Sequence, residues 1–144
     1  MNSTDIEILI VEDDEDDAAL TLKALGELAL GRRAARVRDG EEALEFLFGT
    51  GRHAGRAAPF PRLILLDMRL PKMDGLQVLT IVKGDPRTKS IPVVMLTSSG
   101  REEDVARSYA LGVNSYIVKP ASFDEYAAAV VGAGSYWLTW NKSA

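Results

Sequence analysis

The chain has 144 residues, 47% of them hydrophobic, so it is long enough to bury the core of one domain. Its 17 basic and 21 acidic side chains give a net charge of −4, which offers no general attraction for nucleic acid. The absence of cysteine excludes disulfides, cysteine-based zinc sites and thiol nucleophiles. Residues 1–5 lack the features of a secretory signal, and no apolar run has the length of a membrane span. We therefore expect a cytoplasmic protein that binds neither membrane nor nucleic acid.

Five short apolar runs follow one another along the chain, and their Ile, Leu and Val content is typical of buried parallel strands. In chain order they are Ile6–Val11, Ala34–Val37, Leu63–Leu66, Val93–Leu96 and Tyr116–Val118. A segment with helical features follows each run. This fivefold alternation predicts an α/β fold, with a five-stranded parallel sheet and helices on both faces.

The intervening segments carry helix signals of two kinds. The first helix is expected over Asp17–Leu28. Apolar residues at helical spacing follow two Asp-Gly turns, and two Ser-x-x-Glu patterns predict capping boxes. The residues concerned are Leu44, Leu47 and Phe48 after Asp39-Gly40; Leu76, Leu79 and Val82 after Asp74-Gly75; and the pairs Ser99 with Glu102 and Ser122 with Glu125. The segment Gly49–Pro61 is expected to be a loop.

Polar side chains follow four of the predicted strands, at the edge where open parallel sheets bind ligands. They are Glu12, Asp13 and Asp14 after the first, Asp67 after the third, Thr97 after the fourth and Lys119 after the fifth. Carboxylates from two strands would suit Mg²⁺, which prefers oxygen ligands. Asp67 can act as a nucleophile that accepts a phosphoryl group, while Thr97 and Lys119 can donate hydrogen bonds to its oxygens.

Each of these side chains alone would more often have a structural role, as a helix cap, a turn residue or a solvated charge. Asp14 in particular is expected to be a cap or a solvated residue. His53, the only histidine, lies in the Gly49–Pro61 loop and is given no catalytic role. The functional interpretation depends on the convergence of the other groups on one reaction.

The chain resembles the receiver domains of two-component response regulators over about residues 6–131. The matching segments are residues 8–14, 65–75, 94–98 and 116–120. The resemblance implies a flavodoxin-like fold in which Asp67 is the phosphoacceptor, and Mg²⁺, or Mn²⁺ in its place, is held by Glu12, Asp13, Asp67 and the backbone carbonyl of Arg69. It also implies that Thr97 and Tyr116 form a conformational switch, that Lys119 pairs with the phosphate, and that a partner histidine kinase supplies the phosphoryl group. The expected division is a receiver domain over residues 5–131 and a C-terminal extension of the last helix with a tail over residues 132–144.

A narrower resemblance is to single-domain regulators paired with bacterial phytochromes, through Gly49–Pro61, Asp85–Pro92 and Tyr136–Trp140. It implies a dimer built on the face near the last helix, and we expect a homodimer that uses the last helix and the tail. An apolar stripe at helical spacing comprises Tyr126, Val130, Ala133, Trp137 and Trp140. Tyr126 and Val130 are expected to pack on the domain's own sheet. Trp137, Leu138 and Trp140 are expected to lie beyond that contact and to form the dimer surface.

Three other functions fit the sequence less well. An aspartate-nucleophile phosphatase of the haloacid dehalogenase type would carry a second Asp two residues after Asp67, where this chain has Arg69. A transcription factor would need a helix-turn-helix unit, for which the residues after Pro120 leave no room. A receiver-like scaffold that is never phosphorylated is disfavoured by the intact set of site residues. No enzyme activity is expected beyond self-phosphorylation and self-dephosphorylation.

Overall fold

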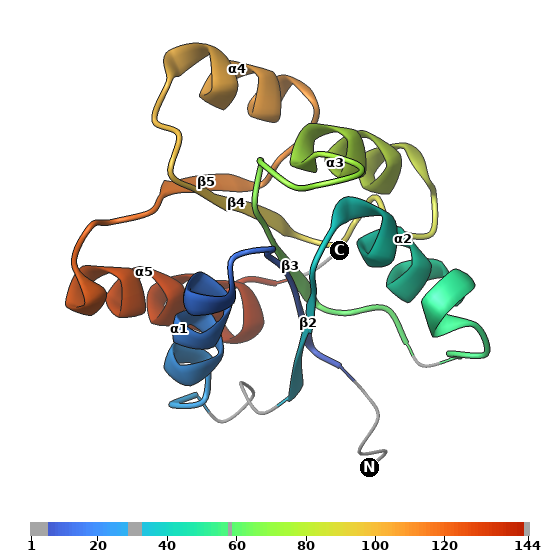
Figure 1. Ribbon diagram of the computed structural model, residues 1–144, viewed down its shortest axis with the longest axis horizontal. Coiled ribbons are helices and arrows are strands. Elements are labelled where there is room, and N and C mark those ends of the chain that lie inside the picture. Colours follow the sequence, from blue (N-terminus) through green and yellow to red (C-terminus); the bar gives the residue numbers. More distant parts are fainter. Residues whose placement is uncertain (1–5, 29–32, 58, 143–144) are drawn as a thin grey trace.

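The computed structural model describes residues 6–28, 33–57 and 59–142. Its five strands are all parallel, in the order β2-β1-β3-β4-β5 (Figure 1). They are β1 (Ile8–Val11), β2 (Ala34–Val37), β3 (Leu63–Leu66), β4 (Val93–Thr97) and β5 (Ser115–Val118). The predicted parallel sheet is therefore confirmed. The chain moves outward from β1 to β2 and then to the opposite side from β3 onward, so β1 and β3 flank the switch point at which ligands bind in such sheets.

Five α-helices follow the strands, as the alternation predicted. They are α1 (Glu15–Leu25), α2 (Gly40–Phe48), α3 (Gly75–Gly84), α4 (Glu102–Ala110) and α5 (Phe123–Ser135). α1 and α5 lie together on one face of the sheet, and α2 and α3 cover the other (Figure 1). β1, β3 and β4 are buried on both faces, which explains their continuous apolar sequences. Within the described residues, no helix is long and apolar enough to cross a membrane.

Helix α4 lies beside β5 (Figure 1). It buries fewer side chains than the other four α-helices. Its only buried side chain is that of Ser108, whose hydroxyl donates to the carbonyl of Asp104 in the same helix. Val105 is half-buried, and Tyr109 is 50% exposed. Helix α4 is therefore attached to the sheet by little apolar contact.

Helix caps decide where the predicted and observed elements differ. α1 begins at Glu15, earlier than expected, because the Asp14 carboxylate accepts the backbone N–H of Asp17 at 2.9 Å. This contact confirms the expected capping role of Asp14. Ser122 likewise accepts from the backbone of Glu125 at 3.2 Å. The expected cap at Ser99 was wrong: α4 begins at Glu102 with Arg101 at the N-cap position, so Ser99 lies two residues too early, and its hydroxyl donates to the Asp104 carboxylate at 2.5 Å.

The C-terminal stripe packs on the domain's own sheet further than predicted. Tyr126 and Val130 are buried there, as expected. α5 then continues into a π-helical turn over Tyr136–Trp140, and the buried positions run on at spacing four through Gly134 to Leu138. The wider turn brings Leu138 into the core, and Trp137 packs against the same cluster.

The prediction that Trp137 and Leu138 lie beyond the docked helix was therefore wrong. Among the tail's tryptophans only Trp140 projects into solvent, at 74% exposed. Gly134 fits this packing, because a Cβ there would lie 2.9 Å from Leu28 and 3.2 Å from Leu25. The expectation of no secretory signal concerns residues 1–5, which lie outside the described residues.

Candidate functional site

The carboxylates of Glu12 and Asp67 are fixed at the carboxyl ends of β1 and β3 by hydrogen bonds that continue the sheet. The backbone N–H of Glu12 donates to Val37 at 3.1 Å, and that of Asp67 donates to Val11 at 3.0 Å. Gly75, the first residue of α3, lets that helix start directly against the site. A Cβ at this position would lie 2.3 Å from the Asp67 carbonyl oxygen. Only glycine therefore fits there without displacing the backbone of Asp67.

Three carboxylates converge at this edge. Glu12, Asp13 and Asp67 each offer an oxygen within 4.8 Å of the other two. Glu12 and Asp67 are buried, whereas Asp13 is exposed, so the group opens to solvent on one side. Burial raises the pKa of Glu12 to about 7, and the Asp67 charge acts in the same direction, against the hydrogen bond from Lys119. A divalent cation among these oxygens would relieve that repulsion, and an all-oxygen group suits Mg²⁺ or Mn²⁺.

Lys119 is the single ammonium of the cluster. Its Nζ donates to Glu12 at 2.7 Å, to Asp17 at 2.8 Å and to Asp67 at 3.0 Å, and its side chain is 10% exposed. Burial alone would lower the pKa of Lys119, but the hydrogen bonds to Asp17 and Glu12 raise it above its ordinary value. The lysine is therefore held protonated. Its backbone N–H donates to the Thr97 carbonyl at 2.7 Å, which joins the end of β5 to the end of β4.

Thr97 is fully buried at the end of β4, and its hydroxyl has no hydrogen-bond partner among the described residues. Such a buried polar group is costly unless a partner arrives. Nearby, the Tyr116 hydroxyl donates to the Ser99 carbonyl at 2.7 Å, and burial raises the pKa of this phenol. The edge of the sheet therefore carries the unpaired hydroxyl of Thr97 and, beside it, the ring of Tyr116, which is hydrogen-bonded to the segment after β4.

Arg69 contributes its backbone more than its side chain. Its N–H donates to the Asp67 carboxylate at 3.1 Å, and its side chain is exposed. His53 is placed apart from the cluster, where it contacts Glu42 at 3.0 Å and packs edge-on against Phe46.

Asp17 is the site residue that sequence reasoning missed. It is the last of six consecutive acids, Glu12 to Asp17, and nothing in their composition distinguishes it. The available signal is helical phase: once α1 begins at Glu15, Asp17 lies four residues before the buried Thr21, on the same side of the helix.

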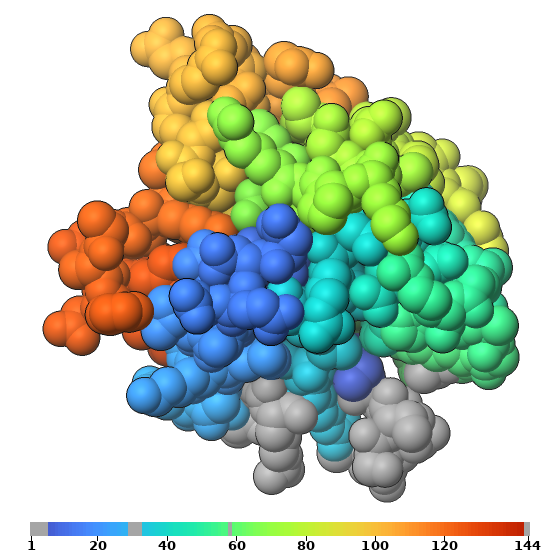
Figure 2. Space-filling model, viewed as in Figure 1, coloured from blue at the N-terminus to red at the C-terminus, as the bar shows by residue number. Residues whose placement is uncertain are grey.

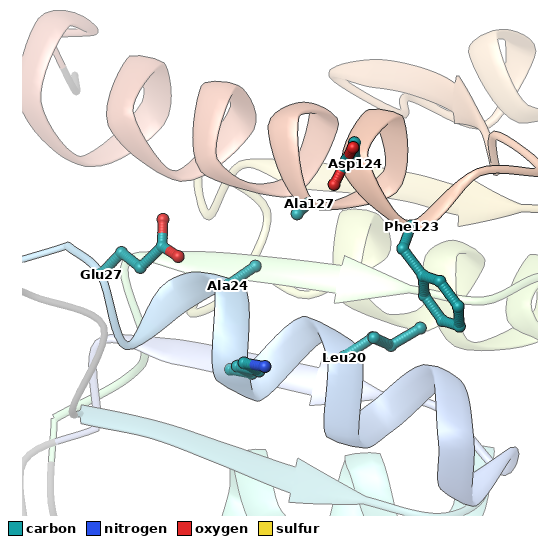
Figure 3. Close-up of a pocket in the computed structure, with 7 residues that line it drawn as sticks. Leu20, Ala24, Glu27, Phe123, Asp124 and Ala127 are labelled. Carbon is teal, nitrogen blue, oxygen red and sulfur yellow. The ribbon is translucent and has the colours of Figure 1, made fainter.

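The site is distinct from an apolar groove between α1 and α5. In Figure 2 the start of α1 (blue), the loop leading into α3 (yellow-green) and the segment after β5 (orange-red) adjoin at the centre of the face shown. A separate groove runs between α1 and α5, where Leu20 and the 71% exposed Phe123 lie close together (Figure 3). The groove is lined by Leu20, Lys23, Ala24, Glu27, Phe123, Asp124 and Ala127. None of the converging acids lines it.

A parallel sheet that gathers acids, one buried lysine and a free hydroxyl at its switch point defines a phosphoryl-accepting signalling domain. The comparison with known families agrees, since the model of the response regulator receiver domain matches residues 8–131. The chain belongs to this family, and the predicted receiver fold and phosphoryl-accepting function are confirmed.

Relatives and solved structures of similar length are known. The probable methanogenesis regulatory protein FilR2 of Methanothrix harundinacea is 43% identical over 136 residues, covering 94% of this chain and 86% of that protein. Response regulator Rcp1 of Synechocystis is 41% identical, with 91% and 88% covered, and the structure of its Mn²⁺-bound form superposes with a TM-score of 0.87 over 95% and 97% of the two chains. The phosphorylated cyanobacterial phytochrome response regulator RcpA superposes with a TM-score of 0.89 at 40% identity, over 96% and 98%. The predicted similarity to phytochrome regulators is therefore confirmed.

Proposed function

We propose that Asp67 is the phosphoacceptor of a single-domain response regulator. The observation that carries this assignment is the buried Asp67 carboxylate, which contacts the Lys119 ammonium at 3.0 Å and shares an oxygen cluster with Glu12 and Asp13. An Asp67 oxygen attacks the phosphorus of the donor. The bond from phosphorus to the leaving atom breaks, and that atom, an imidazole nitrogen or a carboxylate oxygen, keeps the electron pair. Lys119 and Thr97 donate to the phosphoryl oxygens.

We propose that Glu12, Asp13, Asp67 and the carbonyl of Arg69 hold Mg²⁺, with Mn²⁺ able to substitute. The donor set supports this assignment, because all of its side-chain ligands are carboxylates and Lys119 alone cannot balance their charge. When bound, the ion neutralises negative charge on the transferring group. The Mn²⁺-bound form of Rcp1 is a precedent for such an ion in a relative.

Phosphorylation is proposed to act through Thr97 and Tyr116. A phosphoryl group on Asp67 supplies strong acceptor oxygens, which the unpaired Thr97 hydroxyl can approach. That movement alters the space beside Tyr116, whose hydrogen bond to Ser99 holds the segment leading into α4. The face formed by α4, β5 and α5 then carries the signal.

The test is intact-protein mass spectrometry after incubation with acetyl phosphate. One phosphoryl group should be added in Mg²⁺, none in excess chelator, and none to Asp67→Asn. The exposed acid Asp16 gives a matched control, since Asp16→Asn changes the same charge without touching the cluster. No label on the wild-type protein would favour the scaffold alternative. Sustained turnover of a phosphate ester would favour the phosphatase instead.

We infer that the phosphoryl donor is a cytoplasmic histidine kinase, and that a bacterial phytochrome is the best candidate. The likeness to RcpA, a phytochrome regulator, supports this partner. Phe123 lies four residues after Lys119 and beside Leu20 (Figure 3), which gives an exposed apolar contact at the start of α5. Phosphotransfer from a purified phytochrome kinase tests both points: Phe123→Ala should slow transfer from the kinase and leave labelling by acetyl phosphate unchanged.

We propose that the receiver domain spans residues 5–131 and that residues 132–144 extend it into a homodimer contact. Tyr136 and Trp140, 51% and 74% exposed, support such a contact. Truncation after Ser135 would be a poor test, because it removes the buried Leu138, whose carbonyl accepts from Arg62 at 2.7 Å. Trp140→Ala should shift the protein towards monomer in analytical ultracentrifugation. Tyr109→Ala on α4, which removes a comparably exposed aromatic ring, should not; equal sedimentation of both variants and wild type would contradict the proposal.

A further inference from the structure

Asp17 makes a contact that the proposed phosphoryl transfer leaves unexplained. Its Oδ2 accepts from Lys119 Nζ at 2.8 Å, across 102 positions of sequence. Its side chain is 33% exposed, yet it contacts the ammonium of Lys119, a side chain that is only 10% exposed. We propose that Asp17 is a positioning residue, which holds the Lys119 ammonium beside Asp67 while a metal ion occupies the acidic cluster. This inference rests on the proposed function.

The hydrogen bonds of Lys119 define what Asp17 can do. An ammonium has three N–H donors, and all three are used, on Glu12, Asp17 and Asp67. When Asp67 is phosphorylated, the donor that it held becomes available for a phosphoryl oxygen. The other two bonds then fix the position of Nζ, and Asp17 supplies one of them from α1.

Asp17 should contribute most to the position of Lys119 when the metal is bound, because of the charges around the ammonium. Glu12 and Asp67 belong to the group of oxygens that can hold a cation, and Asp17 does not. A divalent ion would neutralise Glu12 and Asp67 and repel the ammonium next to them. Asp17 is then the one carboxylate in contact with Lys119 whose charge is not shared with the metal.

Asp17 is itself held in place by buried groups. The Thr21 hydroxyl donates to the Asp17 carbonyl at 2.9 Å, and the same hydroxyl lies 3.0 Å from that of Tyr126. Because Thr21 gives its single proton to Asp17, Tyr126 must donate to Thr21. Thr21 and Tyr126 are both buried. Through this pair, α5 contacts the first turns of α1 and stabilises the position of Asp17 beside Lys119.

The test compares Asp17→Ala with Asp16→Ala, a neighbouring exposed acid of the same helix. In saturating Mg²⁺ we expect labelling by acetyl phosphate to be about tenfold slower in Asp17→Ala, the effect of one charge-assisted hydrogen bond, and nearly unchanged in Asp16→Ala. Asp17→Asn, which keeps one acceptor oxygen, should fall between them. It also carries the test if Asp17→Ala does not fold, as judged by circular dichroism.

A calorimetric Mg²⁺ titration separates positioning from general charge. In the wild-type background, Asp17→Ala should weaken the binding of Mg²⁺ more than Asp16→Ala does. The reason is that the Lys119 ammonium, without the negative charge of Asp17 beside it, repels the ion. In a Lys119→Met background the two substitutions should have equal effects. Equal effects in both backgrounds, or equal labelling rates, would overturn the role of Asp17. Absence of any label on wild-type protein would instead overturn the proposed function.

Discussion

Two partly buried lysines, Lys119 and Lys83, lie at opposite ends of the sheet, and each makes three hydrogen bonds. At the carboxyl edge, Lys119 donates to three carboxylates at 2.7, 2.8 and 3.0 Å. At the amino edge, Lys83 donates to the carbonyls of Lys89 and Ile91 and to the amide oxygen of Asn114, at 3.0, 2.8 and 2.9 Å. The number of bonds is the same, but the partners of Lys119 are negatively charged and those of Lys83 are neutral.

The difference separates a reactive edge from a structural one. Burial lowers the pKa of Lys83, since its partners are neutral, whereas the pKa of Lys119 is raised by its carboxylates despite burial. One of the Lys83 partners also has a second hydrogen bond within the fold, because the Asn114 amide oxygen accepts from the backbone of Val93 as well. The carboxyl edge instead carries surplus negative charge and the unpaired Thr97 hydroxyl, which a metal ion and a phosphoryl group can satisfy.

Replacement of Lys119 should have the largest effect on phosphorylation. Lys119→Met removes a donor to the transferring phosphoryl group, and we expect labelling by acetyl phosphate to slow by about 100-fold, as for the loss of one preorganised donor. Quantitative mass spectrometry over time gives the rate. Lys83→Met is the matched control and should label at the wild-type rate; similar losses in both variants would remove the distinction between the edges.

Replacement of Lys83 should instead have the larger effect on stability. Lys83→Met leaves the Ile91 and Lys89 carbonyls and the Asn114 amide without this donor, and we expect a loss of about 2 kcal/mol in the free energy of unfolding. Urea unfolding followed by circular dichroism measures this change. A loss below about 0.5 kcal/mol would show that water replaces the ammonium at no cost.

The Arg69 side chain should affect the lifetime of the phosphoryl group without being needed for phosphorylation. Its backbone N–H holds Asp67, but its guanidinium is exposed beside the site and can shield a phosphoryl group from water. We expect the phosphorylated form of Arg69→Ala to have a half-life about threefold shorter than wild type, consistent with a contact of a surface charge. The decay of the phosphorylated mass after donor removal reports it, and an unchanged half-life would exclude the side chain from this role.

The smallest expected effect is on the pH dependence of stability. The folded-state pKa of Lys83 lies below its ordinary value of 10.5, so between these two values the unfolded chain binds more protons than the folded one. The contribution of Lys83 to stability should therefore rise with pH in this alkaline window. The stability difference between wild type and Lys83→Met, measured at rising alkaline pH up to 10.5, should shift in favour of wild type. A difference that stays flat or falls would contradict the assigned direction.

The sequence was sufficient for the sheet, because β1, β3 and β4 are continuous apolar runs whose burial leaves no alternative. It was also sufficient to bring Glu12, Asp67, Thr97 and Lys119 to one edge, since parallel strands share their carboxyl ends. It could not single out Asp17 from six consecutive acids, because the choice depends on where the Asp14 cap starts α1. The start of α1 depends on a single capping hydrogen bond, and the sequence alone does not show which of these acids forms it.

Two further differences have similar causes. Ser99 matches a capping pattern, but α4 begins two residues later than that pattern places it, with Arg101 at the N-cap position. In the tail, Trp137 and Leu138 were expected to lie beyond the docked helix, whereas the chain continues into a π-helical turn in which Leu138 is buried and Trp137 packs against the same core cluster. The start of a helix and a change of helical pitch both depend on tertiary packing, which periodicity does not contain.

The sparse attachment of α4 has a consequence for the energetics of local unfolding. With Ser108 as its only buried side chain, this helix can open while the rest of the domain stays folded. Its backbone amides should exchange with deuterium sooner than those of α5, which buries Tyr126 and Val130. Tyr116 is hydrogen-bonded to the segment that enters α4. Because the free energy of opening α4 is small, a movement of Tyr116 can be enough to open this helix. Of the five α-helices, α4 is therefore the one that phosphorylation can most readily shift between closed and open states.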